Sequence, residues 1–222
     1  MKTIAVTINK GGAGKTMISR SLATAAARAG LAVLIIDMDT QQNSTSWRRR
    51  RPEEEQLPLV QFTTENDLEE TLRRARLADC DLVIIDTPPG PSVYLQQALS
   101  VANLALVVSL ADAASYTALP MIDSLIKTHT AGRKSFVGTS YLINQVDNSR
   151  QLSRDITQIM QGLLGQQVIG TVHRDQSITE ALAYNRNVLD YDPQGRGCHD
   201  ILDCAQALVE RLASAARVEQ PA

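Results

Sequence analysis

Two short runs, VLIID at residues 33–37 and LVIID at residues 82–86, constrain the fold of this chain more than any other feature. Each run is apolar at every position before its final aspartate, so both faces of the strand it forms must be covered. Similar apolar runs alternate with helical stretches along the whole chain. We therefore expect an α/β fold: a doubly wound, mostly parallel sheet flanked by helices on both faces.

The same patterns predict the elements in detail. Strands are expected at Thr3–Ile8, Ala32–Asp37, Leu59–Phe62, Asp81–Asp86, Leu104–Ser109, Phe136–Asn144 and Gln167–Gly170. Helices are expected at Thr16–Ala29, Asp67–Leu77, Ser92–Val101, Ala114–Thr130, Ser149–Leu164, Ser177–Tyr184 and Cys198–Ala215. Because no repeat or linker separates them, we predict a single domain over residues 1–217 and a frayed tail over residues 218–222.

Composition narrows the classes of function. The 222 residues are 44% hydrophobic, enough for one α/β core, and only 4% aromatic, which disfavours a stacking platform for single-stranded nucleic acid. The net charge is −2, so nucleic-acid binding would need a local basic surface. The three cysteines are scattered, no signal segment precedes the first strand, and no apolar stretch approaches the roughly 20 residues that span a bilayer. We expect a soluble, cytoplasmic protein.

The last predicted helix bears on membrane attachment, because a basic amphipathic helix would bind a membrane surface. Its apolar stripe at helical spacing consists of Ile201, Ala205, Leu208 and Leu212. The other face carries acidic and amide side chains and few arginines. This pattern predicts that the helix packs against the sheet and that the protein has no membrane partner.

The segment NKGGAGKTM, residues 9–17, follows the first predicted strand and is typical of a phosphate-binding loop. The standard loop has glycine where this chain has Asn9, and Lys10 is an additional lysine. The glycines would let backbone N–H groups approach a polyphosphate, and the next helix would add its positive N-terminus. Lys15 could reach the β- and γ-phosphates, and the Thr16 hydroxyl could bind Mg²⁺. The alternative is that the glycines only form a tight turn.

Two further strands end in carboxylates, at Asp37 and Asp39 and at Asp86. Carboxyl ends of parallel strands meet at one edge of the sheet, where ligands bind in open α/β folds. Asp37 and Asp39 would point the same way along an extended chain. Asp86 ends a wholly apolar strand and suits the Walker B carboxylate that lies behind the Mg²⁺ ligands. The alternative for Asp37 and Asp39 is an acidic turn that caps the next segment.

Together these motifs resemble the deviant Walker A ATPases of the ParA/MinD group. NKGGAGKT matches their loop pattern x-K-G-G-x-G-K-[ST], followed by D-x-D and by an apolar strand ending in D-x-P. The resemblance continues through YLINQVD and ITEALAYNRNVLDYDPQGRG, so it covers nearly the whole chain and implies binding of ATP and Mg²⁺. Met17 replaces a second Ser or Thr after the loop, which implies slightly weaker affinity. Thr40 replaces the proline of D-x-D-P, which implies a less rigid segment after Asp39.

The resemblance also implies roles for individual residues. Lys10 would be the signature lysine that crosses a dimer interface to the partner's phosphates, so that ATP bridges two subunits. Asp39 would position or activate the attacking water, Asp37 would help to hold the Mg²⁺ shell, and Asn144 would read the adenine edge. The implied nucleotide-binding residues are Lys10, Gly11, Gly12, Ala13, Gly14, Lys15, Thr16, Met17 and Asn144; the catalytic residues are Lys10, Lys15 and Asp39; the metal-site residues are Thr16, Asp37 and Asp86. The plain alternatives are a solvated lysine for Lys10 and a turn asparagine for Asn144.

The resemblance is closest to the short ParA partition ATPases, because the chain leaves no room for a helix-turn-helix before the loop. It implies an ATPase, slow until a partner stimulates it, that binds DNA non-specifically as an ATP-bound homodimer. Such a protein lies on the nucleoid when ATP-bound and segregates or positions a plasmid, chromosome locus or other cargo with a ParB-like adaptor. DNA phosphates would be neutralised by basic side chains, for which the candidates are Arg154, Arg174, Arg186, Arg196 and Arg211.

The run Arg48–Arg51 is a further DNA candidate, but Glu53–Glu55 follow it, so a self-neutralising surface loop is an equal expectation. Other functions of the same fold remain alternatives: a MinD-like spatial regulator, or an amidoligase-type metabolic ATPase. An iron–sulfur ATPase would need interface cysteines directly after the Walker B strand or a C-x-x-C pair. The segment DTPPGPS, residues 86–92, contains no cysteine, and the sequence has no C-x-x-C pair.

Overall fold

The computed structural model describes residues 1–8 and 11–218. Its strands are β1 (Lys2–Ile8), β2 (Val33–Asp37), β3 (Leu59–Phe62), β4 (Leu82–Asp86), β5 (Leu104–Leu110), β6 (Gly138–Val146) and β7 (Val168–His173). Its α-helices are α1 (Lys15–Arg28), α2 (Asn43–Arg50), α3 (Leu68–Leu77), α4 (Val93–Val101), α5 (Ala113–Thr130), α6 (Gln151–Leu164), α7 (Gln176–Ala183), α8 (Val188–Tyr191) and α9 (Arg196–Val218). Short 3₁₀ helices lie at η1 (Glu53–Glu55), η2 (Glu65–Asp67) and η3 (Gly165–Gln167).

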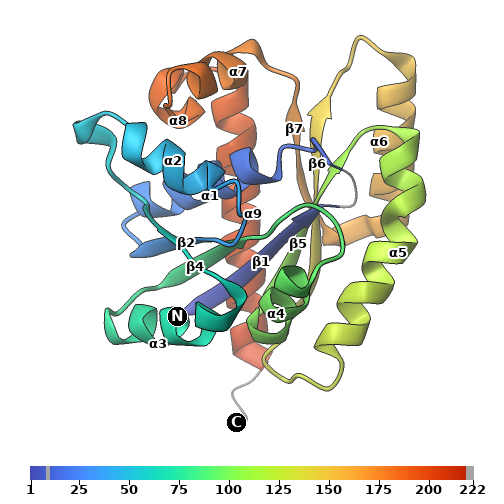
Figure 1. Ribbon diagram of the computed structural model, residues 1–222. Helices are drawn as coiled ribbons and strands as arrows, with labels where there is room; N and C mark the ends of the chain where they lie inside the picture. The colour runs from blue at the N-terminus through green and yellow to red at the C-terminus, as the bar shows by residue number, and fades with distance from the viewer. Residues whose placement is uncertain (9–10, 219–222) are drawn as a thin grey trace.

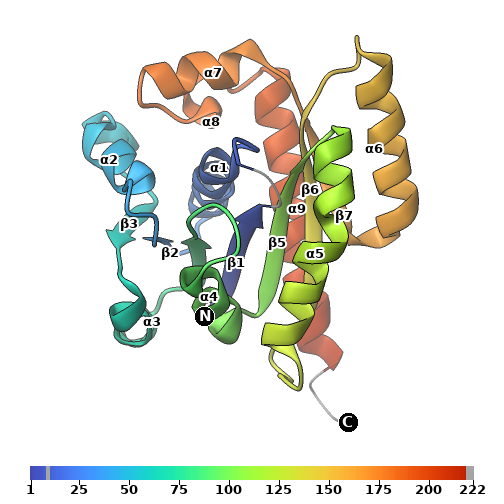
Figure 2. The ribbon, with the colours of Figure 1, turned by 45° about the vertical axis from the view of Figure 1, so that its right-hand side comes forward.

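The strands form one seven-stranded sheet in the order β3-β2-β4-β1-β5-β6-β7, and every neighbouring pair is parallel. Helices lie on both faces of this sheet (Figures 1 and 2). The predicted doubly wound sheet is therefore confirmed, and it is parallel throughout rather than mostly parallel. Because all strands run the same way, their carboxyl ends meet at one edge, far from the N-terminus (Figure 1).

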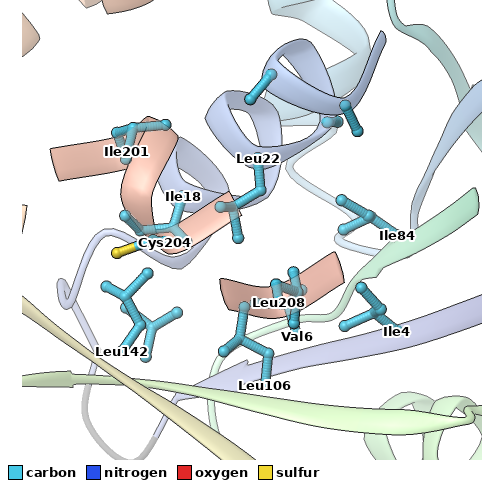
Figure 3. Packing of buried hydrophobic residues seen from close by; sticks show 14 of the residues in the cluster. Ile4, Val6, Ile18, Leu22, Ile84, Leu106, Leu142, Ile201, Cys204 and Leu208 are labelled. Atoms are coloured by element: carbon cyan, nitrogen blue, oxygen red, sulfur yellow. The ribbon is translucent and has the colours of Figure 1, made fainter. Parts of the chain in front are cut away.

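Alternate residues of the central strands pack into two separate cores, as a period of two requires. In β1, Ile4 and Val6 lie in the core formed with α1 and α9 (Figure 3). Ala5, between them, faces the opposite core, which α3, α4, α5 and α6 cover. Burial on both faces explains why β2 and β4 are apolar at every position before their final aspartates.

Helix α9 packs its predicted apolar stripe against the sheet. Ile201, Leu208 and Leu212 are buried in the same core as α1, and Ala205 packs against that core. The prediction that this helix packs rather than presenting an apolar face outward is confirmed. Within residues 1–8 and 11–218, no helix has the length and apolar character needed to cross a membrane.

Every predicted strand and helix is present, with ends that differ by a few residues. Helices α2 and α8 were not predicted. Strand β6 continues past Asn144 to Val146. Gln145 adopts a positive φ of 56°, and the pairing with β7 shifts register between Asn144 and Val146. Helix α9 includes Val218, the first residue of the predicted tail, and residues 219–222 lie outside the described part of the chain.

Candidate nucleotide-binding site

The predicted site residues gather where β1, β2 and β4 end. Asp37 and Asp86 are direct neighbours in the register of β2 and β4, and β1 leads into the loop before α1. Both carboxylates are fully buried. The structure thus brings together the glycine loop and the two acid-terminated strands that the sequence placed at one edge of the sheet.

The loop before α1 leaves the start of that helix open. Gly14 is the N-cap residue in the left-handed region, with φ of 83°, and no side chain caps the first turn. Gly12 also has a positive φ of 81°, and an added Cβ at Gly11 or Gly12 would meet no atom within 4 Å. Free N–H groups at a helix start, with open space beside the glycines, fit an anion such as a phosphate.

Lys15 is buried and forms an ion pair with Asp86. The Asp86 carboxylate also accepts a hydrogen bond from Ser44 Oγ at 2.9 Å and a longer contact from Ser19 Oγ at 3.4 Å. The ion pair with Asp86 fixes the position of the Lys15 ammonium group beside the loop. Lys15 is therefore held next to the phosphate position by the same carboxylate that the sequence assigns to Mg²⁺.

Asp37 is held by the start of helix α2. Its Oδ2 accepts hydrogen bonds from Thr45 N at 2.8 Å and Thr45 Oγ1 at 3.0 Å, and its Oδ1 accepts one from Asp39 N at 3.2 Å. Burial raises the pKa of Asp37 above its ordinary value, and nearby Asp86 adds to this, although the hydrogen bonds from Thr45 and Asp39 oppose it. A cation beside Asp37 would favour its ionised form.

The residues present fit Mg²⁺ held together with phosphates rather than in a protein cage. No group of three or more His, Cys, Asp or Glu side chains that could hold a metal occurs among the described residues. Mg²⁺ keeps several waters and takes one or two protein ligands beside phosphate oxygens. Thr16, half-buried at the start of α1, and the buried pair Asp37 and Asp86 supply hydroxyl and carboxylate oxygens of that kind.

Similarity to known proteins agrees with this geometry. The CbiA family, described as the CobQ/CobB/MinD/ParA nucleotide-binding domain, matches residues 4–188. The chain belongs to this family. Cell division protein PomZ of Myxococcus xanthus is 25% identical over 251 residues, which cover 95% of this chain and 79% of PomZ. The chromosome-partitioning ATPase Soj of Thermus thermophilus is 27% identical over 247 residues, covering 97% of this chain and 98% of Soj.

The fold is also similar to that of a chain from the MinC:MinD cell division protein complex of Aquifex aeolicus. The TM-score is 0.78 at 19% identity, over 95% of this chain and 96% of that chain. The resemblance to the ParA/MinD group is thus confirmed. Asn9 and Lys10 lie outside the described residues, so the role of Lys10 as a signature lysine stays a prediction.

Asn144, near the end of β6, contacts the loop that precedes α1. Its side chain is 1% exposed, and its Nδ2 donates a hydrogen bond to the Ala13 carbonyl at 2.8 Å. A Cβ added to Gly14 would lie 2.5 Å from the same nitrogen. The adenine-reading role remains a prediction, whereas the contact with the loop is a role that the sequence did not suggest.

Two further predicted residues are Met17, which replaces a hydroxyl-bearing residue after the loop, and Asp39, which is predicted to position the attacking water. Met17 is half-buried, its sulfur accepts a hydrogen bond from Ser21 Oγ at 3.6 Å, and it packs against the α1 core. Asp39 is 9% exposed, and its Oδ1 accepts a hydrogen bond from Gln41 N at 2.9 Å. Among the described residues, none donates a hydrogen bond to the second Asp39 oxygen, and the role of Asp39 toward a water stays a prediction.

Sequence reasoning missed helix α2 and the residues that connect it to the site. Ser44 and Thr45 in its first turn contact Asp86 and Asp37. Arg20 of α1 donates from Nε to Ser44 Oγ at 3.3 Å, and its guanidinium lies over the Trp47 ring, 5.2 Å from the centroid. Burial lowers the pKa of Arg20 to about 10, against the opposing effect of Asp86 and Asp37. A lone arginine five residues after Lys15 was the only available signal.

The run Arg48–Arg51 does not form the expected surface loop. Arg48, Arg49 and Arg50 form the last turn of α2, and Arg51 turns inward as its C-cap residue. The Arg51 side chain is 1% exposed, lies 4.4 Å from the Trp47 centroid, and pairs with Asp190 of α8 at 2.7 Å. The loop expectation was wrong because contacts with Asp37 and Asp86 hold the first turn of this helix, whereas its Asn, Ser and Thr residues have low helix propensity.

The other DNA candidates divide into two groups. Arg154 donates to the Asn148 carbonyl, Arg211 donates to the Gln166 carbonyl at 3.0 Å, and Arg186 donates to Glu55 Oε1 at 2.8 Å. Arg174 and Arg196 are exposed, on either side of α7 and α8 in the chain. Their contact with DNA stays a prediction.

Proposed function

We propose that this protein is a ParA-type ATPase that binds ATP and Mg²⁺ at the loop before α1 and dimerises on ATP. In that state it binds DNA without sequence preference, lies on the nucleoid, and positions a cargo through a ParB-like adaptor. The observation that carries the proposal is the convergence of Lys15, Asp37 and Asp86 beside an uncapped helix start. Two relatives, PomZ and Soj, support a cell-division or partition context by their names.

The chain's own residues would act as follows. Lys15 would exchange Asp86 for the β- and γ-phosphates, while the open N–H groups of α1 hold the phosphate oxygens. Thr16 and Asp37 would hold Mg²⁺, with Asp86 behind them, and the ion would neutralise phosphate charge. Lys10 would reach the partner subunit's phosphates and stabilise the charge that develops on them. Asp39, with one oxygen already fixed by Gln41 N, would position the attacking water.

Two alternatives share the fold. A MinD-like regulator would act on a membrane, but the apolar stripe of α9 is buried in the core, which favours DNA as the partner. An amidoligase-type ATPase is consistent with the CobQ/CobB members of the family, but both relatives named above belong to cell division or partition rather than metabolism. DNA binding and dimerisation distinguish the three.

The deciding experiment measures assembly and DNA binding in the same samples. With ATP and Mg²⁺ the protein should sediment as a dimer and bind random-sequence duplex DNA, and with ADP it should do neither. Raising the salt should weaken binding, because each neutralised phosphate releases counterions. Lys10→Ala should still bind ATP but remain monomeric. A protein that stays monomeric and does not bind DNA at saturating ATP would contradict the proposal and favour the amidoligase alternative.

A second test concerns Asp39. Asp39→Ala should lower ATP turnover by about 100-fold, because removing a group that positions the water forfeits the contribution typical of such a residue. ATP affinity should change little, so the ATP-bound dimer should accumulate and remain on DNA. Steady-state phosphate release and sedimentation measure the two effects. Turnover at the wild-type rate would remove Asp39 from the mechanism.

A further inference from the structure

Helix α2 begins at the nucleotide site and ends in a run of arginines at the surface. We propose that its two outward arginines, Arg49 and Arg50, contact the phosphate backbone of DNA, and that the nucleotide site controls the position of this helix. The proposal rests on the proposed function, because it names the DNA-contacting element and its link to ATP. Figure 1 shows α2 beyond the carboxyl edge of the sheet, on the same side as α7 and α8.

The charge of α2 is concentrated in its last turn. The helix contains no acidic residue, and Arg48, Arg49 and Arg50 follow one another at its end. Arg49 and Arg50 are exposed, and neither forms an ion pair with another of the described residues. Exposed, unpaired arginines are free to neutralise phosphates, which is the main source of non-specific DNA affinity.

The acidic run that follows does not cancel this charge in the way the sequence suggested. The Glu55 side chain is 9% exposed and lies between Arg51 and Arg186, with which it forms ion pairs. Arg51 is itself buried against Trp47 and Asp190. Neutralisation therefore takes place inside the molecule, between Arg51, Glu55 and Arg186, and leaves Arg49 and Arg50 outside it.

The outward arginines also differ from the other candidates for DNA contact. Arg154 and Arg211 each donate to a backbone carbonyl, and Arg186 is paired with Glu55. Using any of these three on DNA would break an existing contact. Contact through Arg49 and Arg50 would break no ion pair among the described residues.

The first turn of α2 connects the nucleotide site directly to the surface that carries Arg49 and Arg50. Thr45 N–H, in the first turn, is capped by Asp37 rather than by a residue of its own segment, and Ser44 donates to Asp86. These are the two carboxylates assigned to Mg²⁺, so loading the site changes the partners of the groups that hold the helix. Trp47 lies between Arg20 and Arg51, 5.2 Å and 4.4 Å from their guanidinium carbons, and would report movement of α2.

The test compares the full-length wild type with Arg49→Ala/Arg50→Ala. A matched control is Arg76→Ala/Lys134→Ala, which removes the same charge from two exposed side chains that form no ion pair with another described residue. Binding to random-sequence duplex DNA is measured with ATP and Mg²⁺ over a range of salt. The α2 variant should bind at least about tenfold more weakly, and its log affinity against log salt should be shallower by about 2 per protomer. The control should follow the wild type, and ATP turnover without DNA should not change in either variant.

Two further measurements test the effect of the neighbouring acidic residues and the link between α2 and the nucleotide site. Glu53→Gln/Glu54→Gln, which removes the exposed acids beside α2, should strengthen DNA binding. ATP with Mg²⁺ should change the emission of Trp47, the single tryptophan, and Ser44→Ala should reduce that change. Phosphatidylcholine vesicles containing phosphatidylserine should bind none of the proteins.

The outcomes separate this inference from the proposed function. Wild-type protein that binds no DNA in any nucleotide state would overturn both. Wild-type binding that Arg49→Ala/Arg50→Ala leaves unchanged in affinity and salt slope would overturn only the assignment to α2. Binding to anionic vesicles in place of DNA, lost in the α2 variant, would overturn DNA as the partner. An unchanged Trp47 emission would overturn the control by the nucleotide site.

Discussion

Lys15→Ala is expected to abolish measurable ATP binding. The ammonium group is the one basic side chain that the described loop holds beside the phosphate position, where it is paired with Asp86. Each hydrogen bond from the ammonium group to a charged phosphate oxygen is worth about 1.5–3 kcal/mol, so losing the contacts to the β- and γ-phosphates should lower ATP affinity by about 100-fold or more. Titration of a fluorescent ATP analogue measures the loss directly. Tight binding by this variant would contradict the assignment of the loop.

The same substitution leaves Asp86 buried without its cation, so loss of stability must be separated from loss of binding. Asp86 would retain Ser44 and Ser19 as hydrogen-bond donors, and Ser44 is itself contacted by Arg20. We therefore expect a lower thermal unfolding temperature but a folded protein, which circular dichroism checks. Lys134→Ala, which removes an exposed lysine far along the chain, is the matched control and should change neither quantity.

The sequence predicted those parts of the structure that depend on local patterns. A strand covered on both faces must be apolar throughout, so runs such as residues 82–86 could be assigned as buried strands from the sequence. Their terminal aspartates indicated the edge of the sheet where ligands bind. The loop could be assigned because phosphate binding requires small residues at a helix start, followed here by Lys15. The sheet, its parallel direction and the place of the site followed from these features.

Contacts between distant segments could not be predicted in the same way. Helix α2 has an unfavourable local sequence and depends on Asp37 and Asp86, which belong to other strands. The inward turn of Arg51 depends on Asp190, which is 139 residues away in the chain. The four arginines look equivalent in the sequence. In the fold, Arg51 is buried against Asp190 of α8, whereas Arg49 and Arg50 are exposed.

The glycines of the loop should differ sharply in their tolerance of alanine, and Gly14→Ala should have the largest effect. Its φ of 83° is costly for a residue with a side chain, and the new Cβ would lie 2.5 Å from Asn144 Nδ2. The strain is about 1–2 kcal/mol, and displacing a buried amide from the Ala13 carbonyl adds about 1–3 kcal/mol, so ATP affinity should fall by about 100-fold. Nucleotide titration of the folded variant measures this loss.

Two neighbouring glycines provide graded controls for the same measurement. Gly12→Ala has the positive φ of 81° but no atom within 4 Å of its Cβ, so only the backbone strain applies and the loss should be about tenfold. Gly11→Ala meets neither obstacle and should bind ATP nearly as the wild type does. Asn144→Ala tests the clash itself: combined with Gly14→Ala it should weaken binding by less than the sum of the two single effects, because the atom that the new Cβ would strike is gone. Additive losses, or equal losses at all three glycines, would show that Asn144 does not fix the loop.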